Sequence, residues 1–243
     1  MMKLLIVALF LPLFPFSIML NGLLARLRSP LARSVLLLLW PQIGVLVLYA
    51  IKQPIPDGFV MWALLSSAFY ALRLLTVRDL GLWAGFLASS ALALTWADPG
   101  KSAFDTHVLA FWFSLPSALL ALLAGLLVRR FGAAYTGLYG SLAGTVPRLS
   151  AILVVTLLAA IATPPFPGFF AILGLLHRTS AAPAVLLIWL LWGWAAIKLM
   201  QGFLSGENRI DSVADIGRTG TMFFTCIFGA MVVTGLYLTR GVL

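Results

Sequence analysis

Ionisable side chains within apolar stretches are the residues of this sequence that could move protons. Lys198 lies in the stretch WGWAAIKLMQGF and Arg73 in FYALRLLTV, while His107 follows Asp105 at the start of a third apolar stretch. Ionisable groups inside membrane segments commonly mark ion pathways and proton relays, and histidine changes its charge near neutral pH. These four residues are therefore candidates for a proton path.

Each candidate also has an ordinary structural explanation. Lys198 and Arg73 lie near one end of their apolar stretches, where a long aliphatic stem lets the charged group reach the membrane surface. Arg73 could also pair with Asp79, and Asp105 with His107 could form a polar pair at the surface or accept a proton or metal ion. The proton-path interpretation and the structural one both remain open at this point.

Three of the seven acidic residues occur at four-residue spacing in ENRIDSVADIGR, namely Glu207, Asp211 and Asp215. On a short helix these carboxylates would share one face. A charged face outside a membrane is ordinarily solvated, and the alternative is that it docks a cytoplasmic subunit.

Membrane helices must position these residues. The chain has 243 residues, of which 62% are hydrophobic and 9% charged, and its mean hydropathy is +1.08. A water-soluble core could not bury this much apolar surface. The sequence predicts an all-α, polytopic bundle of about eight transmembrane helices in a single integral membrane domain, 1–243. The apolar runs lie near 4–24, 34–51, 58–77, 80–97, 107–128, 149–176, 183–204 and 219–239.

The basic residues report topology. The net charge is +9, but the arginines are scattered between apolar runs and form no single patch, so nucleic-acid binding is not expected. Arginines concentrate in alternate loops, which predicts a multi-pass protein of the bacterial inner membrane with both termini outside. The first run lacks a clear small-residue cleavage site, so we interpret it as a span and not as a signal peptide.

Enzyme chemistry has no visible basis in this chain. The sequence contains no P-loop, no dinucleotide-binding glycine pattern and no nucleophile with its base. Its one cysteine, Cys226, lies in an apolar run, which excludes a disulfide and a cysteine-based metal site. We expect no cofactor and no metal, and at most a non-catalytic subunit of a larger complex.

Three prolines interrupt the apolar run 149–176, at Pro164, Pro165 and Pro167. Proline lacks an amide hydrogen and its ring clashes with the preceding turn, so the sequence predicts one Pro-broken helix. In lipid, the carbonyls freed by such a break need other hydrogen-bond donors, which places the break against protein or a water-filled cavity. A packing kink with no transport role is the alternative.

Neighbouring residues suit such a break. Gly168 would allow another backbone to approach closely. Thr163 and Thr156 could donate hydroxyl hydrogen bonds to the freed carbonyls.

The stretch VPRLSAILVVTLLAAIATPPFPGFFAILGLL resembles the broken-helix region of antiporter-like subunits of respiratory complex I and of Mrp-type sodium/proton antiporters. Pro147 matches the loop proline of that family. Its proline-proline-glycine-phenylalanine signature is matched by Pro164, Pro165, Gly168 and Phe169. The resemblance covers about 107–206. It leaves 1–106 as divergent N-terminal helices and 207–243 as a cytoplasmic loop and last helix.

One departure from that family bears on function. The family's channel lysine precedes an Ala-Leu-Leu motif, and here Ser117 occupies its place. A neutral hydroxyl cannot hold a proton charge as an ammonium group does. Ser117 therefore marks the point where the usual proton path is in question, and family members are also longer, with more helices.

Two classes of function follow. The first, implied by the resemblance, is an accessory or scaffolding membrane subunit of a proton-coupled complex, partnered by a larger homologous antiporter-like subunit and a cytoplasmic subunit. Such complexes include respiratory NADH dehydrogenase, Mrp antiporters, membrane hydrogenases and inorganic-carbon uptake complexes, of which we prefer the last. The second class is a self-contained small ion transporter or channel. The scarcity of ionisable groups in the apolar runs disfavours it.

Overall fold

The computed structural model describes residues 2–51, 55–98, 103–137, 141–206 and 213–242, with the backbone alone at 103–105 and 239–242. The described part consists of helices and connections, with one isolated β-bridge between Asp79 and Tyr135. This confirms the predicted all-α membrane bundle. The helices are α1 (Met2–Phe10), α2 (Ser17–Arg26), α3 (Pro30–Ile51), α4 (Asp57–Leu74), α5 (Leu80–Ala93), the 3-10 turn η1 (Leu94–Ala97), α6 (Ala103–Phe131), α7 (Leu142–Thr145), α8 (Pro147–Ala160), α9 (Pro167–Arg178), α10 (Ala182–Leu204) and α11 (Arg218–Val242).

Five helical segments of the described part are long and apolar enough to cross a membrane: α3, α5 continued by η1, α6, α10 and α11. The other expected crossings fall on α4 and on two interrupted pairs, α1–α2 and α8–α9. The chain is a multi-pass membrane protein. A total of eight crossings stays a prediction.

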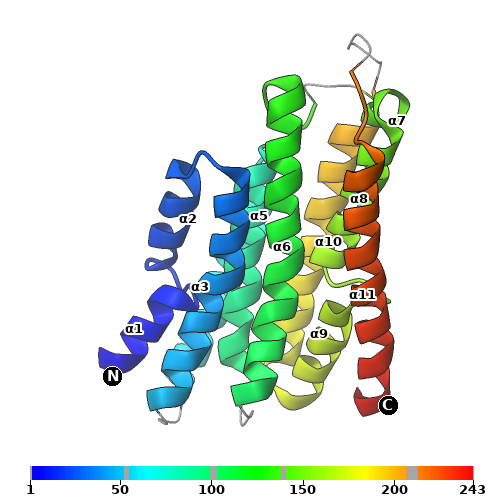
Figure 1. Cartoon of the computed structure of the whole chain (residues 1–243). Helices are drawn as coiled ribbons and strands as arrows, with labels where there is room; N and C mark the ends of the chain where they lie inside the picture. The colour runs from blue at the N-terminus through cyan, green and yellow to red at the C-terminus, as the bar shows by residue number, and fades with distance from the viewer. Residues whose placement is uncertain (1, 52–54, 99–102, 138–140, 207–212, 243) are drawn as a thin grey trace.

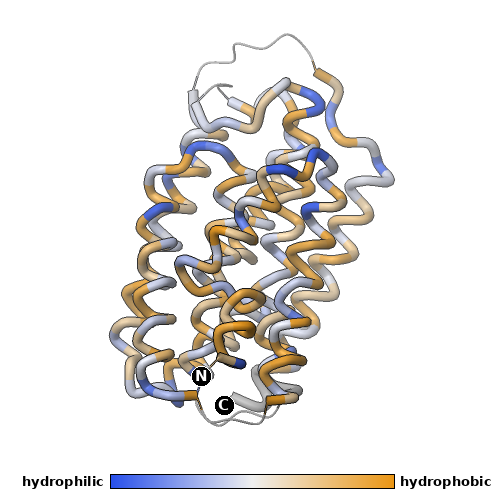
Figure 2. The backbone as a smooth tube through the Cα atoms, turned by 90° about the vertical axis from the view of Figure 1, so that its left-hand side faces the viewer, coloured by the Kyte–Doolittle hydropathy of each residue, from blue (hydrophilic) through white to orange (hydrophobic). Residues whose placement is uncertain are grey.

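The helices run roughly parallel to one long axis, and both chain termini lie at the same end of the bundle (Figure 1). Hydrophobic residues cover most of the length of the helices, while hydrophilic ones gather mainly at the opposite end (Figure 2). That end carries the arginine-rich connections, as expected from the alternation of the loops. Which end faces the cytoplasm remains a prediction from the positive-inside rule.

Small residues let the helices pack closely. A side chain added at Gly125 of α6 would place its Cβ 2.1 Å from Pro30 Cγ, so the first turn of α3 lies directly against α6. Three tryptophans, Trp83, Trp96 and Trp192, are fully buried between the helices. The core therefore has the close packing of a protein interior, even though the outer faces of several helices are apolar.

The predicted break is present, since α8 ends at Ala160 and α9 begins at Pro167. From the sequence we expected one Pro-broken helix, but the first apolar run is interrupted as well. Its helix ends at Phe10 and α2 begins at Ser17, with Pro12 and Pro15 between them. The physical reason is the same, because a proline cannot donate to the carbonyl one turn before it.

Candidate functional site

Two carbonyls at the α8–α9 break are paired within this chain. Leu158 O accepts hydrogen bonds from the Thr163 amide at 3.1 Å and from the Thr163 hydroxyl at 2.9 Å. Ile161 O accepts from Trp189 Nε1 of α10 at 2.9 Å. Thr156 takes no part, since its hydroxyl bonds to Ile152 O inside α8. The break therefore needs no lipid or water to satisfy these two carbonyls.

Helix α11 packs directly against one side of the break. A Cβ at Gly235 of α11 would lie 2.0 Å from the Pro165 carbonyl oxygen, so the two backbones are in direct contact. Gly168 serves a similar purpose at the first turn of α9, where a Cβ would lie 3.2 Å from that of Ala162. Ala162 itself has a left-handed backbone with φ of 57°. Pro164 and Pro165 remain exposed on the surface of the chain.

The α1–α2 break is held in the same manner. Trp96 Nε1 donates to Leu11 O at 3.2 Å and Trp62 Nε1 donates to Phe14 O at 2.6 Å. The Phe14 amide donates to the Ser66 hydroxyl of α4 at 3.1 Å. Pro12 and Pro15 are a sequence signal for this break. The indole and hydroxyl groups that bond to it lie 48 to 85 residues away in the sequence, so no local pattern predicts them.

Polar side chains form a network from α2 into the centre of the bundle. The Ser17 hydroxyl is hydrogen-bonded to the Tyr70 hydroxyl of α4. The Asn21 amide donates to Ser17 O and to the Ser89 hydroxyl of α5, both at 3.0 Å. These four residues connect three helices through neutral groups.

A second set of polar contacts joins α4, α5 and α10. Ser67 and Ser90 exchange hydrogen bonds between their hydroxyls and each other's carbonyls, at 2.7 and 2.8 Å. The Ser90 hydroxyl also accepts from Trp192 Nε1 at 2.8 Å. Both sets thus consist of neutral hydroxyl, phenol, amide and indole groups.

Charge is nearly absent from the interior. Among the described residues, every buried polar side chain except Asp98 is neutral. Asp98 follows η1 and forms an ion pair with Arg178 of α9 at 3.3 Å. Because this pair lies where helices end, the middle of the bundle offers no fixed charge of the kind that coupled carriers use.

Ser117, at the position where the sequence resemblance implies a lysine, is buried in α6 and only 1% exposed. Its hydroxyl donates to Phe113 O of the same helix at 3.2 Å. One turn earlier, Ser114 is also fully buried, and its hydroxyl has no hydrogen-bond partner among the described residues. Both groups are neutral, so this part of α6 carries no proton charge.

Lys198 and Arg73 both lie on the outside. Lys198 is exposed, and its Nζ donates to Leu75 O at 3.3 Å, beyond the last residue of α4. Arg73 is also exposed, and its guanidinium lies over the Phe86 ring, 5.7 Å from the centroid. Asp79 accepts from the Leu82 amide at the start of α5. The structure thus keeps both cations out of the buried network.

His107 lies at the end of the bundle that carries the termini. Its Nδ1 is hydrogen-bonded to Gln42 Oε1 of α3 at 2.9 Å. The side chain of its predicted partner, Asp105, lies outside the described residues. The predicted pairing of these two side chains is therefore untested.

Of the three acidic candidates, Asp215 alone lies within the described residues. Glu207 and Asp211 lie outside the described residues. Asp215 accepts hydrogen bonds from the Arg148 amide at 2.8 Å and the Leu149 amide at 3.1 Å. Its carboxylate caps the first turn of α8. The two amides precede Asp215 by 67 and 66 residues in the sequence. In the described part of the chain, no three His, Cys, Asp or Glu side chains gather as metal ligands do.

Comparison with known sequences gives little. No protein-family profile matches the chain. A curated protein of Aquifex aeolicus (strain VF5), described as uncharacterized, is 24% identical over 193 residues, which are 79% of this chain and 81% of that protein.

Comparison with solved structures decides the fold. A chain of respiratory complex I from Thermus thermophilus superimposes with a TM-score of 0.79 and 21% identity over 97% of this chain and 54% of its own length. The chain has the fold of complex I and Mrp membrane subunits. A chain of the Mrp complex from Dietzia sp. DQ12-45-1b gives a TM-score of 0.71 at 20% identity, covering 85% of this chain and 42% of that one.

A third solved structure agrees. A chain of the membrane-bound sulfane sulfur reductase, an archaeal respiratory membrane complex, gives a TM-score of 0.77 at 13% identity, covering 96% of this chain and 51% of that one. The chain thus spans about half the length of the solved chains it resembles. At these identities the likeness concerns the fold.

Proposed function

We propose that this chain is an accessory or scaffolding membrane subunit of a proton-coupled complex of the complex I and Mrp type. The observation that carries the proposal is that both hydrogen-bonded sets of the interior, one around Ser89 and one around Ser90, are neutral, in a fold otherwise found in subunits of such complexes. Hydroxyl and amide groups can orient and connect helices, but they do not hold a proton charge in the membrane interior as lysine or glutamate does.

The position of the candidate cations supports the same proposal. Lys198 and Arg73 are exposed and contact a helix end and an aromatic ring, so neither extends the buried network. Ser117 adds a neutral group at the position where the family resemblance implies a lysine. The competing class, a self-contained transporter, would need ionisable groups at mid-membrane depth, and the described interior provides none there.

The finer assignment concerns the assembly. The proposed partners are a larger antiporter-like membrane subunit and a cytoplasmic subunit, and the proposed orientation puts both termini outside. Among proton-coupled complexes, we propose inorganic-carbon uptake as the first to test. A respiratory dehydrogenase, an Mrp antiporter or a membrane hydrogenase are the other outcomes.

The proposal makes two measurements decisive. The purified chain, reconstituted alone in liposomes, is expected to carry no flux driven by a pH gradient, and robust proton or sodium transport would overturn the accessory role. Gentle extraction from native membranes is expected to recover the chain with a larger antiporter-like subunit. The cytoplasmic subunit that accompanies them identifies the type of complex.

A further inference from the structure

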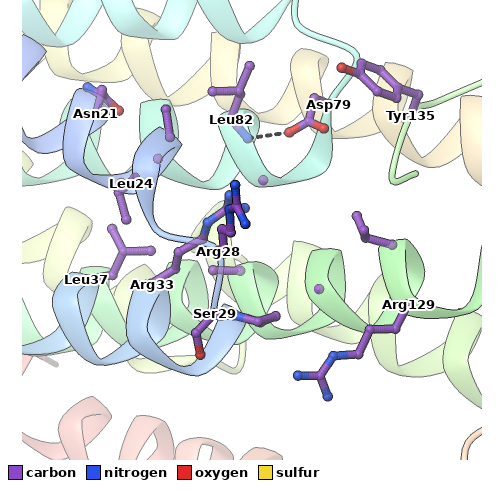
Figure 3. A pocket seen from close by; sticks show the side chains of 17 residues that line it. Asn21, Leu24, Arg28, Ser29, Arg33, Leu37, Asp79, Leu82, Arg129 and Tyr135 are labelled. Atoms are coloured by element: carbon purple, nitrogen blue, oxygen red, sulfur yellow. Dashed lines mark hydrogen bonds between the residues drawn. The ribbon is translucent and has the colours of Figure 1, made fainter. Parts of the chain in front are cut away.

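A cavity of about 620 Å³ opens at the arginine-rich end of the bundle. It lies between the α2–α3 connection, the first turn of α5 and the last turns of α6 (Figure 3). Three arginines line it, Arg28, Arg33 and Arg129, and the one carboxylate in its wall is that of Asp79. The proton-path and docking hypotheses make no use of this cavity.

Its electrostatic character is positive. Asp79 offsets one charge, but one of its carboxylate oxygens already accepts from the Leu82 amide at 2.8 Å. Arg33 is half-buried, and its Nε donates to Leu27 O at 2.7 Å, which fixes the guanidinium beside the first turn of α5. The N-terminal ends of α3 and α5 and the C-terminal ends of α2 and α6 all border the cavity, so the partial charges of the helix ends offset each other and the arginines set the sign. The complementary ligand is therefore an anion.

The arginines come from separate elements. In Figure 3, Arg28 of the α2–α3 connection and Arg33 of the first turn of α3 extend toward the first turn of α5, while the side chain of Arg129 of α6 points away from them. A guanidinium presents a planar fork of donors that matches phosphate oxygens. Two such forks side by side suit a phosphate group better than a single lysine would.

The rest of the wall is mainly apolar, although Asn21, Ser29 and Tyr135 also line it. Leu24 and Leu37 form its inner side, while Leu82 and Val128 at its mouth are 44% and 45% exposed. The cavity also lies at the arginine-rich end of the bundle, where we expect the membrane surface. A free phosphate ion would use the arginines alone, whereas a phospholipid would use both parts of the wall.

We propose that this cavity binds the phosphate of an anionic phospholipid, with the head group on Arg28 and Arg33 and the acyl chains over Leu82 and Val128. This binding site is independent of the accessory-subunit function. It does not depend on which end of the bundle faces the cytoplasm.

The test is lipid titration of the full chain, extracted from membranes with its partners and stripped of lipid in detergent. Dioleoylphosphatidylglycerol is compared with dioleoylphosphatidylcholine, and bound lipid is counted by native mass spectrometry. Arg28→Gln is expected to weaken binding of the anionic lipid on the order of tenfold, the loss of one charge-assisted hydrogen bond. Arg129→Gln is expected to weaken it less, because the Arg129 side chain points away from the other two arginines. Arg26→Gln removes an exposed arginine outside the cavity and is expected to bind like the unaltered protein.

Two further arms make the outcome unambiguous. Arg28 and Arg129 are exposed, so melting temperatures without lipid are expected to be unchanged, and these variants thus report binding and not folding. An excess of inorganic phosphate is expected to leave the lipid bound. Displacement by phosphate would assign the site to a soluble anion, and equal affinity in all three variants would remove the site altogether.

Discussion

Trp189 of α10 donates its indole N–H to the carbonyl oxygen of Ile161, the residue that follows the last turn of α8. Three other tryptophans do the same around the α1–α2 break. Trp40 donates to Leu9 O, Trp96 to Leu11 O and Trp62 to Phe14 O. Both breaks are therefore stabilised by indole donors of this chain, which explains why carbonyls freed by proline can exist inside a membrane bundle.

Trp189→Phe is expected to destabilise the protein by about 1 kcal/mol, because the Ile161 carbonyl loses its donor while most of the ring packing stays. The measurement is the free energy of unfolding in detergent. Trp194→Phe is the control. Trp194 lines a surface groove together with Trp189 and Ile161, is 62% exposed and has no hydrogen bond among the described contacts. Equal effects of the two substitutions would mean that the indole bond does not hold the break.

Gly235→Ala tests the contact of α11 with the break. Its methyl group would meet the Pro165 carbonyl at 2.0 Å, and this overpacking is expected to cost about 1–3 kcal/mol. Gly229→Ala in the same helix has no heavy atom within 4 Å of the added Cβ. The control is thus expected to be neutral or slightly stabilising. Melting temperatures in detergent measure both effects. An unchanged melting temperature of the Gly235→Ala variant would show that α11 can move away from the break.

How far the sequence predicts this structure depends on the range of the interaction. Apolar runs and the prolines at 164, 165 and 167 are local signals, and both the helices and the α8–α9 break follow from them. The same reasoning applied to Pro12 and Pro15 would have predicted the α1–α2 break. We interpreted that run as continuous because its length suits a single span.

The hydrogen-bond partners could not be read in this way. Thr163 bonds to the freed Leu158 carbonyl as predicted, but Thr156, also expected to do so, bonds within its own helix. Asp215 and the α8 amide that it accepts from are 67 residues apart in the sequence, and Trp189 and Ile161 are 28 residues apart. These contacts depend on tertiary packing, which has no periodic signal in one sequence.

Asp215→Ala separates capping from docking. Loss of the two α8 amide bonds is expected to destabilise the protein by about 1 kcal/mol. Unfolding of the purified chain measures this effect, with Asp57→Ala, an exposed carboxylate in the first turn of α4, as the comparison. If Asp215→Ala left stability unchanged yet released a cytoplasmic partner from the complex, docking would be its role instead.

Lys198→Met is expected to leave the proton-coupled activity of the assembled complex intact. Methionine keeps much of the apolar stem, and the lost contact is one exposed hydrogen bond to Leu75 O at 3.3 Å. Lys198→Ala removes the stem as well, so a small loss of stability is expected there alone. Abolished pumping or uptake in both variants, with normal assembly, would establish Lys198 as a proton relay.

Replacing Pro164 and Pro165 together by Ala addresses the break itself. The change favours a continuous helix by about 3 kcal/mol per proline. A helix continued through this segment would remove the Pro165 carbonyl from Gly235 and the Ile161 carbonyl from Trp189. We therefore expect weaker assembly or weaker ion coupling of the complex, measured by copurification of its partners and by flux.

Pro183→Ala serves as the matched control, because Pro183 occupies the first turn of α10, where proline interrupts no helix hydrogen bond. It is expected to assemble and function normally. Pro164 and Pro165 are exposed on the surface of the chain, where a partner helix could contact the break. Straightening the break would then weaken that contact, so assembly is measured as well as activity. A double variant that assembles and couples ions like the unaltered protein would reduce the break to a packing kink.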